Sequence, residues 1–277
     1  MQVAEPLVSS WKASLALDFR FANQKTTLAG KFHDGPLVVQ KPLYPEGGEI
    51  CHAIIVHPPG GIAGGDELTL KVKTEKNASA LLTTPGASKW YRSAGPWAKQ
   101  SVAFNAEGTL EWLPQETIVF DGALAQTAYD VNLAAGAAFI GWDIVCLGRT
   151  GSGERFARGK LRTSIQVRRD GKLLWLERGR IDGGGKLLES PAGLGGDPVF
   201  GTLFASSPLI DKKILETMRA LFPTAGRGAV TLLPGILLAR YLGDSSEAAR
   251  RYFLALWRIL RPALTGREAI EPRIWRT

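Results

Sequence analysis

Cysteine, histidine and long apolar runs are all scarce in this chain of 277 residues. The two cysteines, Cys51 and Cys146, cannot form a disulfide framework, and each lies in an apolar segment where a free thiol acts as a small hydrophobic group. The longest apolar stretches, 133–142 and 229–239, fall short of the ~20 residues that a membrane helix needs. Because the N-terminal segment also has no signal-peptide core, we expect a cytoplasmic protein with no membrane span.

The motifs of several enzyme classes are absent as well. The glycine-rich segments 57–66 and 147–154 match neither GxxxxGK[ST] nor GxGxxG, which argues against nucleotide binding. No GxSxG elbow is present, and a catalytic triad would have to use one of three histidines. Cys51, His52 and His57 are close in sequence, but along one strand Cys51 and His57 are about 20 Å apart and His52 points the other way. We therefore predict neither an enzyme nor a resident metal site.

The net charge of +8 is concentrated in two segments. Residues 1–148 carry a net charge of −3, whereas 149–180 carry +7 and 245–277 carry +4. Such basic segments attract polyanions or acidic protein surfaces. The sequence has no recognised nucleic-acid-binding module, so a solvated basic face and an acidic protein partner are the two interpretations that remain.

Glycine and proline are abundant, with 32 and 16 residues, and indicate many turns. Residues 13–205 contain short apolar runs about ten residues apart, and the alternation of Leu15, Leu17 and Phe19 is typical of a half-buried strand. Since no helical pattern separates these runs, they predict stacked antiparallel or mixed sheets rather than βαβ units. Without a linker or repeat, we predict a single domain over 1–277.

A first helix is predicted at about 208–222, with Ser207 as N-cap, Pro208 in the first turn and an apolar stripe at helical spacing. The segment after it, ending near residue 244, predicts a strand or a strand pair broken at Pro234 and Gly235. The expected order is therefore strand, helix, then strand again.

A second helix is predicted at about 246–261. Ser245 or Ser246 would cap its start, and Pro262 would end it. The apolar residues of both helices recur at the spacing of a core-facing stripe, so we expect both helices to pack on the sheets.

Two acidic residues lie in strands that are apolar enough to be core. Asp143 and Glu177 would each be costly as buried carboxylates unless they were paired, hydrated or protonated. One interpretation is a structural ion pair with Arg149, Arg178 or Arg180. The other is a hydrated path through the interior, and both remain open at this point.

Six motifs occur in register from about residue 13 to the C-terminus, and together they closely resemble the urease accessory protein family UreD, called UreH in some organisms. They are HPPGGIAGGD (57–66), LLTTPGASKWYRS (81–93), LEWLPQETIVFDGA (110–123), FIGWDIVCLGRTGSGE (139–154), VTLLPGILLARYLGD (230–244) and EPRIWRT (271–277). Six motifs in the expected order make the resemblance highly specific.

The resemblance implies a non-catalytic maturation factor. Family members bind the urease apoprotein and UreF, which recruits the GTPase UreG carrying nickel, and together they deliver nickel and carbon dioxide to the urease active site. The implied fold is mainly β, with layered, helically wound mixed sheets and two helices near the C-terminus. No resident cofactor is implied, because nickel is only in transit.

The resemblance also implies an internal water-filled channel, and the matching motifs place Asp66, Ser88, Asp143 and Glu177 along it. Carboxylate and hydroxyl oxygens suit such a path, since they release nickel faster than a Cys/His cage would. The alternative is that the same acids only stabilise the fold and the chain is a pure docking scaffold with no nickel path.

The basic C-terminal segment around Arg273, Trp275 and Arg276 predicts a partner surface for UreF or urease. A different class of function also remains open, namely a β-rich ligand- or glycan-binding protein or a metal-dependent hydrolase on a β scaffold. A neighbouring set of urease genes would favour the maturation role over that class.

Overall fold

Two large β-sheets account for most of the computed structural model, which describes residues 10–276. In spatial order the seven-stranded sheet consists of β14 (Lys172–Asp182), β13 (Lys160–Arg169), β11 (Leu124–Leu133), β8 (Ala98–Ala106), β5 (Glu67–Thr74), β1 (Lys12–Ala22) and β2 (Lys25–Asp34). From β1 to β13 all neighbours are parallel, and the two edge pairs are antiparallel. The strand alternation predicted at the N-terminus is confirmed, because Leu15, Leu17 and Phe19 are all buried.

The second sheet has ten strands. Its main path is β16 (Arg227–Leu233), β17 (Ile236–Gly243), β15 (Val199–Ser206), β12 (Ala138–Leu147), β9 (Thr109–Trp112), β6 (Ser79–Thr83), β4 (Ile50–Val56) and β3 (Val38–Val39). Two short strands, β10 (Thr117–Val119) and β7 (Ser88–Trp90), continue alongside β12. The predicted strand pair near the C-terminus is confirmed as the β16–β17 hairpin, which turns at Pro234 and Gly235.

The chain alternates between the two sheets, passing from β4 to β5, β6, β8, β9, β11, β12 and β13. Successive visits to one sheet lie side by side and parallel, so the chain winds helically around a shared interior. The antiparallel pairs β12–β15, β15–β17 and β16–β17 make the second sheet mixed. The predicted fold class, mainly β with helically wound mixed sheets, is confirmed.

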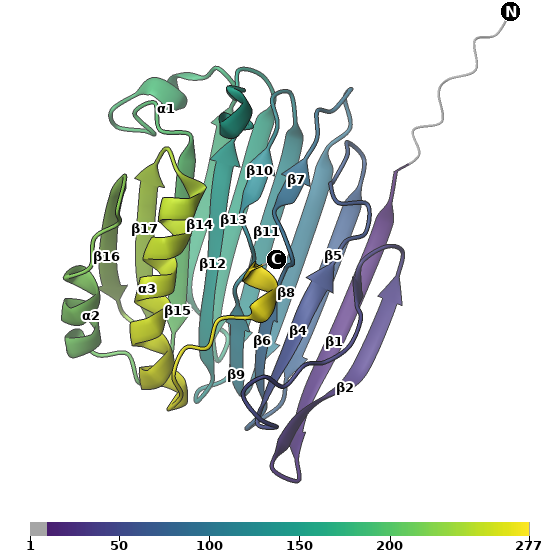
Figure 1. Ribbon diagram of the computed structural model, residues 1–277, viewed down its shortest axis with the longest axis vertical. Helices are drawn as coiled ribbons and strands as arrows, with labels where there is room; N and C mark the ends of the chain where they lie inside the picture. The colour runs from purple at the N-terminus through teal and green to yellow at the C-terminus, as the bar shows by residue number, and fades with distance from the viewer. Residues whose placement is uncertain (1–9, 277) are drawn as a thin grey trace, which may run out of the picture.

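Strand β12 shows how the layers are built, because it is buried on both faces. Phe139 and Val145 point into the apolar core between the two sheets, whereas Ile140 and Trp142 point to a second core beneath the helices. An uninterrupted apolar strand is typical of this position. The helices α2 (Lys212–Arg219) and α3 (Ser246–Thr265) form the third layer, with α3 lying along the face of the ten-stranded sheet (Figure 1).

The first predicted helix begins later than expected. Ser207 is not its N-cap, because the Ser207 hydroxyl accepts a hydrogen bond from the Leu209 backbone in a turn. Helix α2 starts at Lys212, and the Asp211 carboxylate caps it by accepting from the Ile214 amide at 2.8 Å. A carboxylate placed three residues before a free amide competes successfully with the upstream serine as a cap. The short helix α1 (Lys186–Glu189) was not predicted.

The second predicted helix runs further than expected. Ser245 caps α3 as predicted, by accepting from the Ala248 amide, but Pro262 does not end the helix. Proline removes one backbone donor, yet the helix continues to Thr265, whose hydroxyl donates to the Arg261 carbonyl. The left-handed Gly266 then ends it. Within residues 10–276, no helix has both the length and the apolar character that crossing a bilayer requires.

A buried ionic network fastens α3 to the ten-stranded sheet. Arg261 is 0% exposed, and its guanidinium donates to the Glu111 carboxylate at 3.0 Å and to both oxygens of Glu46 at 2.7 Å. Trp257 Nε1 donates to Glu111 at 2.6 Å, and His52 Nε2 lies 2.6 Å from Glu46 Oε1. The network joins α3 to β9, to β4 and to the loop before β4. Sequence reasoning did not single out Glu46, Glu111 or Arg261.

Candidate functional site

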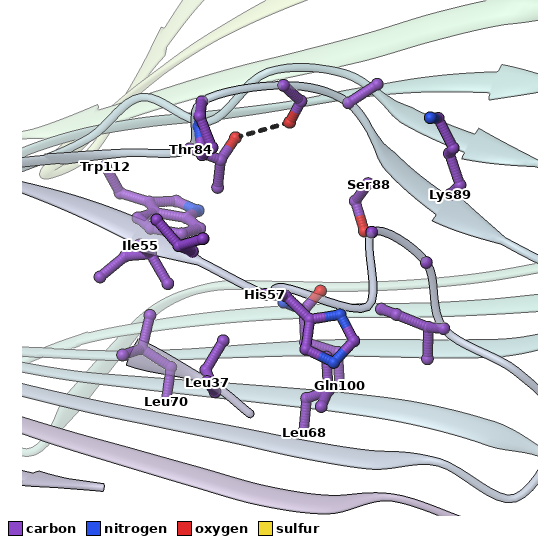
Figure 2. A pocket seen from close by; sticks show the side chains of 17 residues that line it. Leu37, Ile55, His57, Leu68, Leu70, Thr84, Ser88, Lys89, Gln100 and Trp112 are labelled. Atoms are coloured by element: carbon purple, nitrogen blue, oxygen red, sulfur yellow. Dashed lines mark hydrogen bonds between the residues drawn. The ribbon is translucent and has the colours of Figure 1, made fainter. Parts of the chain in front are cut away.

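A cavity of about 280 Å³ opens near the loops that follow β4 and β6. Its apolar wall comes from Leu37, Ile55, Leu68, Leu70 and Trp112, and its polar lining includes His57, Thr84, Ser88, Lys89 and Gln100. Figure 2 shows His57 and the Ser88 hydroxyl directed into the same space from opposite sides, with the leucines below. Ser88, one of the predicted path residues, therefore lines a real cavity.

Asp66 shapes the loop beside this cavity rather than lining it. The Asp66 carboxylate is 2% exposed and accepts hydrogen bonds from the Trp11 amide at 2.7 Å and from the Ala63 amide at 2.8 Å. The negative charge of Asp66 still affects His57 in the cavity. Burial lowers the pKa of His57, and the charge of Asp66 opposes part of this decrease. Asp66 thus fixes the loop after β4 and adds negative potential next to the cavity.

From Ser88 a row of polar side chains leads across the inner face of the ten-stranded sheet. Ser88 on β7 is the register partner of Thr117 on β10, and partners in parallel strands lie about 4.8 Å apart on the same face. The Thr117 hydroxyl donates to the Asp143 carboxylate at 3.3 Å. Thr117 therefore lies between the predicted residues Ser88 and Asp143, beside the first and hydrogen-bonded to the second.

Asp143 lies between the sheets with 7% of its surface exposed. Burial raises the pKa of Asp143 from 3.8 to about 6, a rise that the Thr117 hydrogen bond opposes and the charge of Glu177 adds to. Burial and the Asp143 charge likewise raise the pKa of Tyr129 on the facing sheet well above its ordinary value. Among the described residues no cation forms an ion pair with Asp143, so its negative charge is uncompensated by the protein.

The row continues from Asp143 to Glu177. Asp143 is the register partner of Thr202 on β15, and Thr202 is the partner of Arg240 on β17. Arg240 Nη1 donates to the Thr202 hydroxyl at 2.5 Å and to Glu177 Oε1 at 2.8 Å, and Nη2 donates to Glu177 Oε2 at 2.5 Å. Because Glu177 lies on β14 of the other sheet, this ion pair joins the two sheets at the end of the row.

The structure corrects the ion-pair interpretation of these acids. Glu177 does form an ion pair, but with Arg240 and not with Arg149, Arg178 or Arg180. Arg149 pairs with Glu154 instead, and Arg178 and Arg180 lie at alternate positions of β14 that face outward. A residue 63 positions away in sequence becomes the partner because β17 and β14 end up opposite each other.

The seven-stranded sheet offers polar side chains to the same interior. Gln100, Thr127 and Thr163 are successive register partners on β8, β11 and β13. Gln100 lines the cavity, and the Thr127 hydroxyl oxygen is buried without a hydrogen-bond partner in the part of the chain that the structure describes. A buried polar atom without a partner is unusual and indicates a place for water or a polar ligand.

Chemically, this interior holds single oxygen donors in a row and no preformed cage. Within residues 10–276 no group of three or more His, Cys, Asp or Glu side chains is arranged to hold a metal ion. Cys51 belongs to the core between the sheets, and His52 points to the opposite face, where it meets Glu46. Cys51 and His52 therefore point to opposite faces of β4.

The C-terminal residues have mixed environments. Trp275 packs on Trp142 and Trp257 beneath α3, and its indole nitrogen donates to the Thr83 hydroxyl at 2.8 Å. Arg273 and Arg276 are exposed. Trp275 therefore holds the C-terminal turn η2 (Arg273–Arg276) against the molecule, and of the three predicted surface residues the two arginines present their side chains outward.

Sequence reasoning missed three members of the row. Thr117 and Arg240 lie inside the quoted motifs 110–123 and 230–244, and Thr202 lies in the apolar strand β15. The signal that would have found them is the one that found Asp143: a polar side chain on the buried face of an apolar strand.

Comparison with known proteins places the chain in a family. A profile of the UreD urease accessory protein family matches residues 12–276. The urease accessory protein UreD of Azoarcus sp. (strain BH72) is 50% identical over 279 residues, covering 100% of this chain and 97% of its own length. Those of Dechloromonas aromatica and Pseudomonas aeruginosa are 53% and 52% identical, covering 97% of this chain and 95% and 96% of their own lengths. The chain therefore belongs to the UreD family of urease accessory proteins.

Proposed function

We propose that this chain is a urease maturation factor that binds the urease apoprotein and UreF, and UreG through UreF, and that supports delivery of nickel to the urease active site. The relatives that match nearly the whole chain are named urease accessory proteins, which supports the maturation role. The proposal assigns no catalysis and no resident cofactor to the chain, and it places the protein in the cytoplasm. Nickel is cargo in this account.

The observation that carries the nickel path is the row of polar side chains on neighbouring strands of an otherwise apolar interior. It starts at the cavity with Ser88, passes through Thr117, Asp143 and Thr202, and ends at the Arg240–Glu177 pair. Burying so many polar groups opposes folding unless they are satisfied or hydrated. Supporting hydrated nickel in transit would explain why they are there.

Electrostatics supports passage rather than storage. Asp143 has no cationic partner among the described residues, so a divalent ion beside it would relieve the penalty of a buried negative charge. A single carboxylate and neighbouring hydroxyl groups hold a hydrated divalent ion weakly, whereas several Cys or His ligands would hold nickel tightly. Weak contacts in sequence suit an ion that must leave again.

One observation favours the scaffold alternative. The Arg240–Glu177 ion pair connects β17 to β14 and so ties the two sheets together at their edge. In the scaffold account Glu177 stabilises the fold, and the partners dock on the outer surface. The two accounts make different predictions for Asp143, which has no such pair.

The test is urease activation with purified or co-expressed partners, using Asp143→Ala and Glu177→Ala. We expect both variants to lower the nickel content of the matured urease while co-purification with UreF and urease remains intact. Loss of co-purification would assign the residues to the scaffold, and normal nickel content with intact assembly would refute the path. Asp170→Asn is a suitable control, because Asp170 lies in the exposed β13–β14 turn at a positive φ that asparagine tolerates.

A further inference from the structure

We propose that His57 is a direct, transient nickel ligand at the start of the polar row, so that the ion is bound by an imidazole before it meets the oxygen donors. This inference rests on the proposed function. It assigns a role to a residue that is not among those that the family resemblance places along the channel, which are Asp66, Ser88, Asp143 and Glu177. His57 follows directly after β4, in the loop whose other end is Asp66.

The imidazole of His57 is an unused ligand. It lines the cavity together with Ser88 and Gln100, yet neither of its ring nitrogens has a hydrogen-bond partner in the described part of the chain, and Nε2 is buried. The other two histidines differ, since His52 is hydrogen-bonded to Glu46 and His33 is exposed on β2. A buried, unpartnered ring nitrogen is unfavourable for stability alone.

The chemical state of His57 suits metal binding. Burial lowers the pKa of this imidazole, so the neutral form, which alone binds a metal, predominates at neutral pH. Nickel prefers imidazole to carboxylate or hydroxyl oxygen, and therefore one imidazole is the strongest single contact that this interior offers. Among the described residues that line the cavity there is no second histidine and no cysteine, so no further imidazole or thiol converts the contact into a trap.

The charges around the cavity support entry of a cation on the His57 side. Asp66 is close enough to act electrostatically on His57, and its carboxylate is held in place by two backbone amides. Lys89 also lines the cavity, but its side chain is exposed and in Figure 2 extends on the far side from His57. The interior path then begins across the cavity at Ser88.

Histidine ring signals in an NMR titration test the assignment without any partner protein. The full chain, with ¹³C-labelled histidine, is titrated with nickel chloride, and the signals are assigned with His33→Gln, His52→Gln and His57→Gln variants. Paramagnetic nickel should broaden the His57 signals at a concentration about tenfold lower than those of His33, a difference of about 1.4 kcal/mol in binding. Broadening of His33 first, with His57 unaffected, would overturn the proposal.

A delivery assay separates this inference from the proposed function. His57→Gln keeps a polar side chain, and we expect it, like Asp143→Ala, to slow nickel incorporation into urease with unchanged assembly. If Asp143→Ala slows incorporation while His57→Gln does not, and nickel leaves the His57 signals sharp, then only the ligand role of His57 is refuted. If neither variant changes incorporation, the nickel path itself fails.

Discussion

Replacing Asp143 with asparagine should make the protein more stable at neutral and alkaline pH. The substitution keeps the shape of the side chain and its capacity to accept from Thr117, but it removes the buried charge. Burial raises the pKa of Asp143 from 3.8 to about 6, so between these pH values the folded protein holds a proton that the unfolded chain releases. As pH rises through this window, the wild type loses about 3 kcal/mol of unfolding free energy that the variant retains.

Urea unfolding at pH 5 and pH 8 measures this effect. At pH 5 the wild type has already lost about half of the 3 kcal/mol of unfolding free energy. The difference in unfolding free energy between Asp143→Asn and the wild type should therefore grow by about 1.5 kcal/mol between pH 5 and pH 8. The exposed control Asp170→Asn should show no such growth. An advantage for Asp143→Asn that does not change with pH would refute the account of Asp143 as a buried, uncompensated carboxyl group.

Two further predictions concern helix α3 and the C-terminal turn η2. Glu111→Gln should lower the free energy of unfolding by about 3 kcal/mol, because Arg261 is fully buried and loses one of its two anionic partners. Chemical denaturation measures this loss, and an unchanged unfolding midpoint would contradict the prediction. Charge reversal of both Arg273 and Arg276 should weaken pull-down of UreF or urease while leaving the unfolding midpoint unchanged, since both side chains are exposed. Undiminished pull-down of both partners would rule out a partner surface there.

Local patterns predicted the strands well, but the expectation of a core strand around Glu177 was wrong, because β14 lies at a sheet edge with nearly all its side chains exposed or half-buried. The alternation at the N-terminus predicted that Leu15 and Leu17 share a buried face, and both lie in the core between the sheets. Such predictions succeed because the direction of a side chain along a strand depends only on its position in the sequence. The helical winding of the sheets was expected only from the resemblance of the six motifs to the UreD family.

Contacts between distant segments were beyond local patterns. Arg240 meets Glu177 only because β17 and β14 face each other, and Arg261 meets Glu111 150 residues away only because α3 packs on the ten-stranded sheet. The end of α3 beyond Pro262 is a similar case, because Leu264 in the turn that proline weakens is buried in the core beneath the helices. Tertiary packing decides all three features.

The rate at which nickel enters urease in the presence of Asp143→Asn tests the central claim most directly. This variant is expected to be at least as stable as the wild type, so a defect in delivery is not a defect in folding. The nickel-path account predicts slower incorporation than with either the wild type or Asp170→Asn, at equal co-purification with UreF and urease. Incorporation at the wild-type rate would contradict it.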